Sequence, residues 1–338
     1  MLTKSEIREL LQKLVYNRTL TQEELYKLLD EAYEQSHDVL FTAILIWAKD
    51  IDSKNIVSTV KWLQKNMVEI QNAPANAIDI CGTGGDQFDT FNISTASAFV
   101  IAEAGVPVIK NGGRSNRERA GSSDVLKALN MQLCKNPASC DVALKNSNIA
   151  FLDAPSFHPA LSTFRLIRVK LGIPTILNIA AAISNPARIT RQVIGVYSRN
   201  LVKNVADALC KMYNTKHALV VYGDGIDEIT NCGITLVAEI KINSVTHYRI
   251  EPEMFELHTT TIKEIRGGST RYNAEIIKDA LSGVYGPCAD VIALNAGAGI
   301  YVSGLTKTLR DGVFMAKEII ASGRGLKKLK QAQSVLKQ

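Results

Sequence analysis

One stretch constrains this chain more than any other: Asp79-Ile-Cys-Gly-Thr-Gly-Gly-Asp86, followed at once by Thr90-Phe-Asn-Ile-Ser-Thr95. The apolar residues around Asp79 predict a buried strand, and the glycines after it let the backbone turn and approach a ligand closely. Asn92, Ser94 and Thr95 are typical of a helix amino terminus. A helix that begins beside a glycine turn presents N–H groups and a positive dipole end, so the stretch predicts an anion site, most often for phosphate.

The stretch matches neither of two familiar phosphate-binding motifs. No Gly-Lys-Ser or Gly-Lys-Thr follows it, and Gln87 stands where a dinucleotide fingerprint has its third glycine. On these residues alone a plain tight turn stays open, and a phosphate site is favoured.

Composition sets broad limits on the chain. Its 338 residues are enough for two domains, and 46% hydrophobic with 21% charged residues is ordinary for a globular protein. No apolar run approaches the ~18 residues of a membrane span, and residues 1–6 lack a signal-peptide pattern. We therefore expect a cytoplasmic protein without membrane contact. The net charge of +6 fits anionic ligands or weak nucleic-acid binding.

The six cysteines are scattered without a Cys-x-x-Cys pair, which predicts neither a zinc site nor a disulfide framework. Cys81 lies in the glycine stretch. No base is adjacent to it, so we interpret it as a small buried side chain rather than a nucleophile.

Residues 1–72 have a helical pattern. Capping-box signals and apolar stripes at helical spacing occur in this part, and the stripes predict a helical core or a dimer face. The signals are Thr3 with Glu6 and Thr21 with Glu24, and the stripes include 39–47 and 56–63.

After a linker at 72–76, strands and helices alternate, which predicts an α/β domain with a mostly parallel sheet. The expected strands are 106–109, 149–152, 217–222 and 234–240, and the expected helices include 127–129 and 201–212. The basic tail with Lys327, Lys328 and Lys330 is interpreted as a solvated helix end.

The glycine stretch with Asn92-Ile-Ser-Thr95 resembles the anthranilate phosphoribosyltransferase family. Further stretches agree in order, from about Leu10 to Leu326. They are Val108-Ile-Lys110 with Gly112, Arg114 and Gly121-Ser-Ser-Asp124; His158-Pro-Ala160 with Arg168, Leu171-Gly172 and Asn185-Pro186; Asp224-Gly-Ile-Asp-Glu228; and Leu294-Asn-Ala296 with Tyr301-Val302 and Gly304.

The resemblance implies an architecture and a reaction. The fold would be of the nucleoside phosphorylase/phosphoribosyltransferase type. It would have a small helical domain (1–72, joined by part of 162–188) and an α/β domain that binds the donor (73–338), with the active site at a hinge. The family forms homodimers through the helical domain. It is a magnesium-dependent glycosyltransferase family that moves a 5-phosphoribosyl group from phosphoribosyl diphosphate to anthranilate in tryptophan biosynthesis.

The resemblance also implies roles for residues. Asp227 and Glu228 would hold two Mg²⁺ ions, with Ser94 completing one site, and Arg168 would meet the acceptor carboxylate. We assign no general base, because an aromatic amine already has its lone pair free. Substrate-binding positions are Gly82, Gly85, Asp86, Thr90, Asn92, Ser94, Thr95, Lys110, Asn111, Gly113, Ser122 and Arg168.

Taken without the resemblance, the charged residues of this set also allow an interpretation in which they have no functional role. Asp227 and Glu228 also fit a solvated acidic turn. Lys110 also fits an exposed lysine at a strand end, and Arg168, three residues after Arg165, fits the surface of an amphipathic helix.

Several acceptor positions depart from the family pattern. Where the family has Lys-His-Gly-Asn-Arg, this chain has Lys110-Asn-Gly-Gly-Arg114, so Asn111 replaces a histidine and Gly113 an asparagine. Ala181 and Ala182 replace a Gly-Pro pair, and 115–119 is bulky and charged. Two readings follow: an anthranilate enzyme, slow or compensated by Arg117 or Arg119, or a transferase for another aromatic amine.

A binding protein is the alternative from another class. Some relatives of this fold bind nucleic acid, and Lys110, Arg114, Arg117 and Arg119 with the basic tail would form a phosphate-tracking surface. Few aromatic residues lie among these basic residues to stack on bases, and the acidic pair Asp227 and Glu228 is intact. Both observations favour the transferase. Nucleoside phosphorolysis rests on fold analogy alone.

Overall fold

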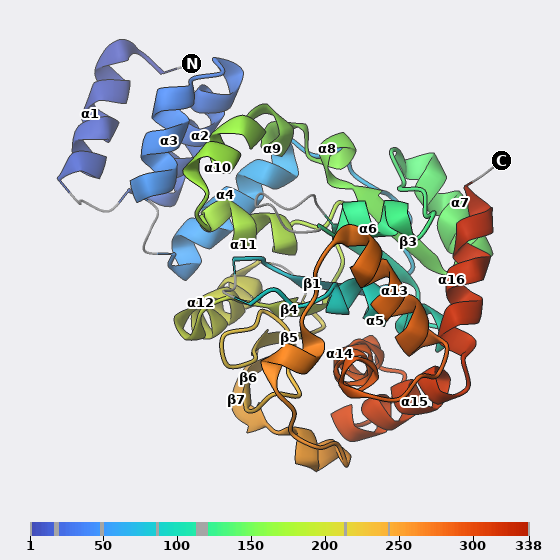
Figure 1. Ribbon diagram of the computed structural model, residues 1–338. Coiled ribbons are helices and arrows are strands. Elements are labelled where there is room, and N and C mark those ends of the chain that lie inside the picture. Colours follow the sequence, from blue (N-terminus) through green and yellow to red (C-terminus); the bar gives the residue numbers. More distant parts are fainter. Residues whose placement is uncertain are drawn as a thin grey trace.

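The computed structural model describes residues 2–16, 20–47, 51–85, 88–112, 121–212, 215–242 and 244–336, without the side chains of 15, 46 and 47. The chain begins with helices α1 (Lys4–Val15), α2 (Gln22–Glu34), α3 (Asp38–Trp47) and α4 (Ser53–Lys65). Both predicted capping boxes are present, with Thr3 and Thr21 accepting from the N–H groups of Glu6 and Glu24. These helices form one end of the molecule (Figure 1).

The centre of the molecule is a mixed sheet. Its five-stranded part has the order β1 (Asp79–Gly82), β4 (Arg191–Gly195), β5 (His217–Tyr222), β6 (Thr235–Lys241) and β7 (Ser244–Ile250). The β1–β4 and β4–β5 pairs are parallel, and β6 and β7 join antiparallel. The parallel pair β2 (Val108–Gly112) and β3 (Ile149–Asp153) connects through a bridge between Ile78 and Val108. The predicted α/β class with a mostly parallel sheet is confirmed.

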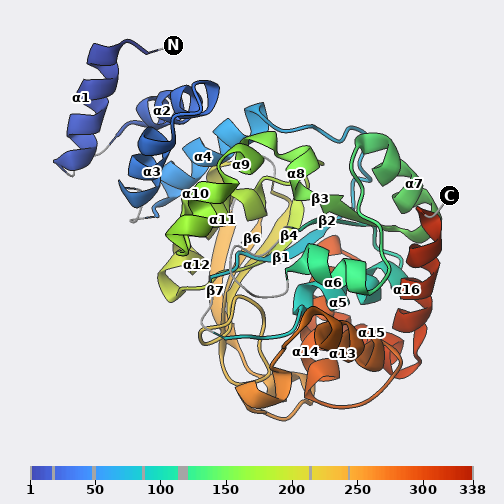
Figure 2. The same ribbon diagram turned by 45° about the horizontal axis from the view of Figure 1, so that its top comes forward.

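The remaining helices surround this sheet, as Figure 2 shows. They are α5 (Ile93–Glu103), α6 (Ser122–Ala128), α7 (Pro137–Ser147), α8 (Ala154–Phe157), α9 (Pro159–Thr163), α10 (Arg165–Leu171), α11 (Ile176–Ile183), α12 (Arg199–Lys211), α13 (Thr270–Leu281), α14 (Pro287–Ser303), α15 (Leu309–Ala321) and α16 (Arg324–Val335). Two 3₁₀ turns, η1 (Pro252–Phe255) and η2 (Ile262–Ile265), lie between β7 and α13.

Alternation along the strands divides the core into two layers. In β5, Leu219 and Val221 pack into the cluster that contains α5 and α14. Ala218 and Val220 belong to the cluster that contains α4, α11 and α12. Successive side chains of a strand point to opposite faces, so each face is covered by its own helices.

The segment from α9 to α11 packs against the N-terminal helices. Phe164 stacks on Phe41 with ring centroids 3.6 Å apart, and α11 contacts α4. The same hydrophobic cluster also reaches one face of the sheet. The helical layer is therefore continuous with the α/β core, and the predicted boundary at residue 72 remains a prediction.

The element boundaries differ from expectation in several places. The expected strand 106–109 is β2, which begins at Val108 and extends to Gly112, and the expected helix 127–129 is the end of α6. β4 and β7 were not predicted. The interpretation of the tail as a solvated helix end is wrong for Lys328, which is 9% exposed and lies 3.6 Å from Glu103, because α16 packs against α5 and α7.

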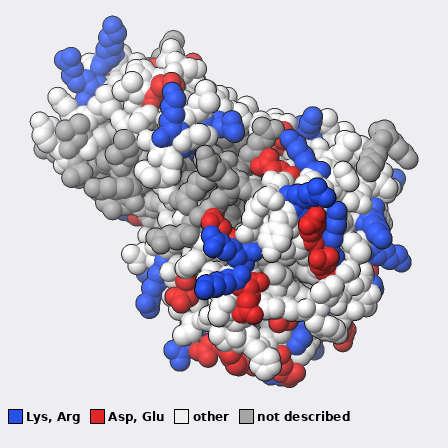
Figure 3. Space-filling view, in the orientation of Figure 1, with Lys and Arg blue, Asp and Glu red and all other residues white. Residues whose placement is uncertain are grey.

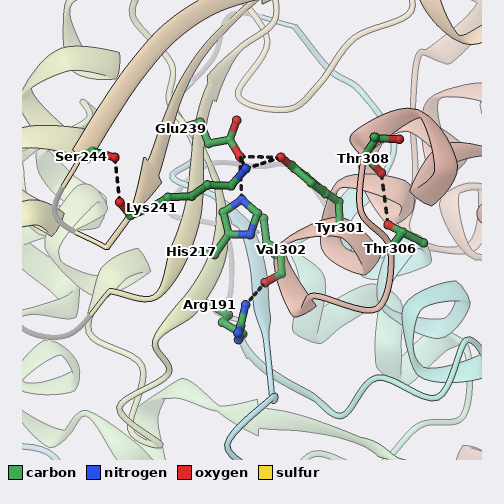
Figure 4. A network of polar contacts seen from close by, with 9 residues as sticks. All are labelled: Arg191, His217, Glu239, Lys241, Ser244, Tyr301, Val302, Thr306 and Thr308. Carbon is green, nitrogen blue, oxygen red and sulfur yellow. Dashed lines mark hydrogen bonds and ion pairs between the residues drawn. The ribbon is translucent and has the colours of Figure 1, made fainter.

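A polar cluster lies where β5 begins and β6 ends, as Figure 4 shows. The Glu239 carboxylate is 2.7 Å from His217 Nε2 and 2.8 Å from Lys241 Nζ, and accepts from Tyr301 Oη at 2.8 Å. Tyr301 comes from the last turn of α14, so the cluster ties this helix to the sheet.

Candidate active site

A pocket of about 1040 Å³ gathers most of the predicted site residues. It is lined by the glycine loop, the first residues of α5, the end of β2, the acidic turn after β5 and the segment from α8 to α11. The predicted residues in its wall are Gly82, Gly85, Thr90, Asn92, Ser94, Lys110, Asn111, Ser122, Arg168, Asp227 and Glu228. Thr95 is fully buried outside this lining. Asp86 and Gly113 lie outside the described residues, as do Arg114, Arg117 and Arg119.

The glycine loop is held on two sides. Gly84 and Gly85 have φ angles of +68° and +95°, the left-handed region that favours glycine. The Gly84 N–H donates to Asp227 Oδ2 at 2.6 Å, and Asn178 Nδ2 of α11 donates to the Thr83 carbonyl at 3.3 Å. The loop is thereby connected both to the acidic turn and to the helical layer.

Helix α5 begins beside this loop, as predicted. Its N-cap residue is Asn92, whose side chain caps no N–H of the helix, and Ser94 lies in the first turn. The Ser94 N–H donates to Glu228 Oε1 at 3.3 Å. The positive end of the helix therefore faces a carboxylate of the acidic turn.

Lys110 is buried in the pocket floor. It lies within β2 and is 2% exposed, so the interpretation as an exposed strand-end lysine is wrong. Its ammonium donates to the Ile80 carbonyl at 2.5 Å and to Ser94 Oγ at 3.1 Å. β2 runs beside β1, which is why a strand residue reaches the glycine loop.

Asp227 and Glu228 lie in the turn after β5, and both side chains are buried, at 8% and 7% exposure. The interpretation as a solvated acidic turn is therefore wrong. Burial and the neighbouring Asp227 charge raise the pKa of Glu228 well above its usual value. Two crowded carboxylates in a pocket wall favour a cation beside them.

The turn approaches the strand ends so closely that only glycine fits. A Cβ at Gly195 would lie 1.6 Å from the Asp227 carbonyl oxygen, and one at Gly82 would lie 2.3 Å from Asp227 Oδ2. From the other side, Asn295 of α14 accepts from the Ile229 N–H at 3.0 Å and donates to the Ile229 carbonyl at 2.7 Å. The acidic pair is fixed by backbone contacts on both sides.

The donor set fits magnesium. The described part of the chain holds no group of three or more His, Cys, Asp or Glu side chains that would form an all-protein site. Two carboxylates with the Ser94 hydroxyl nearby match an ion that keeps several waters and takes further oxygens from substrate phosphates.

Another part of the pocket wall is formed by Asn111 and the segment from α8 to α11. Asn111 Nδ2 donates to the Ala181 carbonyl at 3.0 Å and lies 3.4 Å from His158 Nε2. Burial lowers the pKa of His158 to about 4, so its imidazole is neutral at pH 7. Burial also lowers the pKa of Arg168 to about 10. Arg168 and Arg165 both line the pocket.

Sequence reasoning missed several residues of the pocket wall. They are Phe88, His158 as a wall residue, Asn178, Arg266, Gly267, Gly268 and Asn273. One signal was available, because Arg266-Gly-Gly-Ser-Thr270 again places glycines directly before a helix. Cys81 is buried and its thiol pKa is raised by burial, in keeping with a small buried side chain.

Comparisons with known proteins match most of the chain. Residues 74–326 match the family model described as glycosyl transferase family, a/b domain. An anthranilate phosphoribosyltransferase of Methanosarcina mazei is 39% identical over 330 residues, covering 96% of this chain and 89% of that protein.

Solved structures are similar in fold over almost the whole chain. The crystal structure of the Thermus thermophilus anthranilate phosphoribosyltransferase has a TM-score of 0.89 at 31% identity, covering 97% of this chain and 99% of that one. The Saccharomyces cerevisiae enzyme, solved in complex with PRPP and Mg, has a TM-score of 0.88 at 26% identity, with 99% of both chains covered.

Proposed function

Because the chain belongs to the anthranilate phosphoribosyltransferase family, we propose that it transfers the 5-phosphoribosyl group of phosphoribosyl diphosphate (PRPP) to anthranilate. The products are N-(5-phosphoribosyl)anthranilate and diphosphate, as tryptophan biosynthesis requires. One observation carries the proposal: a single pocket joins the glycine loop, the α5 amino terminus and Lys110 to the buried pair Asp227 and Glu228.

The donor would occupy the glycine-loop side of the pocket. Backbone N–H groups at a helix amino terminus and a buried ammonium both favour anionic oxygens. We assign Gly82, Gly85, Thr90, Asn92, Ser94, Lys110 and Ser122 to donor binding, and we retain Asp86 and Thr95 from the family pattern. The first seven line the pocket.

Magnesium would be held by Asp227, Glu228 and Ser94. When bound, it supplies positive charge to the diphosphate oxygens. The relative solved with PRPP and Mg supports this ion, and the proposal of two ions rests on the family resemblance.

The chain's own groups match what the transfer demands. The anomeric carbon takes on oxocarbenium character while negative charge grows on the departing diphosphate. Lys110 and the α5 amino terminus supply fixed positive charge that would stabilise the diphosphate, and the pocket would hold the amine in line with the bond that breaks. The amine needs no general base.

The acceptor would lie between Arg168 and Asn111. A guanidinium binds a carboxylate with paired hydrogen bonds. The His158 imidazole beside Asn111 keeps a histidine ring in this wall, although the family's own histidine position is occupied by Asn111. Gly113 also belongs to this proposed subsite. Another aromatic amine as acceptor remains the alternative.

A nucleic-acid-binding role has less support. Lys110 is buried, so it adds nothing to a phosphate-tracking surface. On the face drawn in Figure 3, positive and negative side chains of the described residues are interspersed.

We further propose that the protein is a cytoplasmic homodimer that contacts its partner through the helical domain. Leu166 and Val169 of α10 are 69% and 40% exposed, and Ile173, which follows the helix at the edge of the pocket, is 58% exposed. Such an exposed apolar stripe favours a partner. No helix in the described part of the chain is long and apolar enough to cross a bilayer.

The decisive experiment is calorimetric titration with PRPP and Mg²⁺, followed by anthranilate with fluorescence detection of its consumption. Donor binding with consumption supports the proposal, and donor binding without it indicates another acceptor. Asp227→Asn combined with Glu228→Gln should abolish transfer while the thermal unfolding transition is retained. Unchanged activity in that variant would exclude the metal assignment.

A further inference from the structure

We propose that Asn273 is a positioning residue that sets the orientation of the Asn92 side-chain amide, so that Asn92 presents its N–H₂ group to the donor. The inference rests on the proposed function and adds a residue that neither the sequence motifs nor the metal site contains. Asn273 lies in the first turn of α13 and is 3% exposed.

Two hydrogen bonds connect Asn273 to the pocket wall. Its Oδ1 accepts from the Gly268 N–H at 2.7 Å, and its Nδ2 donates to Asn92 Oδ1 at 3.1 Å. All three residues line the pocket. Asn273 therefore connects the segment 266–270 to Asn92, the N-cap residue of α5.

Chemistry fixes the direction of this chain of hydrogen bonds. A backbone N–H can only donate, so the Asn273 atom that faces Gly268 must be the oxygen. Its other end must then be the amide nitrogen, which donates to Asn92. Asn92 consequently turns its oxygen toward Asn273, and its nitrogen is the end that can donate to an anionic phosphate oxygen.

The surrounding backbone keeps Asn273 in place. Gly267 N–H donates to the Asp89 carbonyl at 2.6 Å, and Phe91 N–H donates to the Ile265 carbonyl at 3.3 Å. A Cβ at Gly267 would lie 2.8 Å from both Asn273 Oδ1 and the Phe91 nitrogen. The segments 89–91 and 265–267 are therefore closely paired, and the Asn273 amide cannot reverse without losing the hydrogen bond from the Gly268 N–H.

A double-mutant cycle tests the inference, with the dissociation constant for PRPP in the presence of Mg²⁺ as the readout. We expect Asn273→Ala and Asn92→Ala each to weaken PRPP binding about ten- to hundredfold, the range for one hydrogen bond to a charged group. The PRPP dissociation constant of the double variant should exceed that of the weaker-binding single variant by no more than about twofold, because Asn273 acts through Asn92. Additive losses would overturn the inference.

Controls separate this effect from general damage. Asn204→Ala removes a similar amide bond, to the Ile51 carbonyl at 2.8 Å, outside the pocket, and should leave PRPP affinity unchanged. Alanine is preferred to aspartate at 273 because a new negative charge would repel the phosphates directly. If thermal unfolding shows that Asn273→Ala does not fold, Asn273→Ser replaces it in the same cycle. A wild-type protein without affinity for PRPP would overturn the proposed function itself, and this inference with it.

Discussion

Lys110 shows at the scale of one residue how burial changes the role of a charge. Burial raises the pKa of Asp79 to about 6, and the Lys110 ammonium opposes this rise. The same ammonium opposes the rise at Glu228. Lys110 restores neither pKa to its ordinary value, and Asp227 adds a further negative charge beside Glu228. We propose that a bound Mg²⁺ would oppose this rise further and keep the carboxylates of the acidic turn ionised.

Arg168 and Arg165 give a matched pair for locating the acceptor. We expect Arg168→Gln to raise the KM for anthranilate about ten- to hundredfold while the dissociation constant for PRPP changes little, because only a carboxylate contact is lost. Steady-state kinetics with varied anthranilate, together with PRPP titration, measures both. Arg165→Gln is the control, because the Arg165 side chain is exposed and better hydrated. Equal effects of the two changes would contradict the assignment.

At the scale of elements, α14 acts on the acidic turn through Asn295. Asn295→Ala leaves the buried N–H and carbonyl of Ile229 without these partners. We therefore expect the free energy of unfolding to fall by about 1–3 kcal/mol. The same change should raise the Mg²⁺ concentration for half-maximal activity, because the turn loses its fixed position. Urea unfolding and magnesium titration measure the two effects. Wild-type behaviour in both would show that the turn is held by other contacts.

The Glu239 cluster predicts a specific response to acid. Burial raises the pKa of Glu239, but hydrogen bonds from His217, Lys241 and Tyr301 outweigh it and lower the pKa to about 2. Because the pKa of Glu239 in the folded state is below the ordinary value of 4.5, the carboxylate stabilises the fold at pH values above 4.5. This contribution is lost as the pH falls toward 2. The contribution is on the order of 3 kcal/mol.

Glu239→Gln should therefore remove that part of the pH dependence. We expect urea unfolding between pH 2 and 5 to show a shallower slope in the variant than in the wild type. Activity at neutral pH should change little, because Glu239 is outside the pocket lining. An unchanged slope would mean that the cluster does not set acid stability.

At the scale of the whole molecule, the exposed stripe on α10 and just beyond it predicts the oligomeric state. Leu166→Glu combined with Val169→Glu should convert a dimer into a monomer, because charges would replace the apolar contact. Light scattering after size-exclusion chromatography gives the mass. A wild-type monomer at micromolar concentration would contradict the proposed interface.

The fold was largely predictable because its signals are local. The capping boxes at Thr3 and Thr21 and the strand at 217–222 agree with the structure. β7 was missed because it is an edge strand whose exposed side chains do not alternate with buried ones. β4 was missed because Val193 and Ile194, its only adjacent apolar pair, lie between Gln192 and Gly195, which leaves no distinct apolar run.

The candidate site was predictable where motifs are contiguous. The glycine loop, Asp227 and Glu228 were identified, and the structure places them in one pocket. The burial of Lys110 was not predictable, because it depends on β2 lying next to β1 in space. Asn273 was missed because its contacts are with Gly268 and a residue 181 positions away.

The contact of the acidic turn with Gly82 and Gly195 has a consequence for engineering. Neither position has room for a methyl group, so a mutant library aimed at new acceptors gains nothing by varying them. Asn111, Ala181 and Ala182 also line the pocket, and the atoms that crowd both glycines belong to Asp227 and Glu228 instead. We propose varying those three positions to change the acceptor while the proposed donor-binding residues are retained.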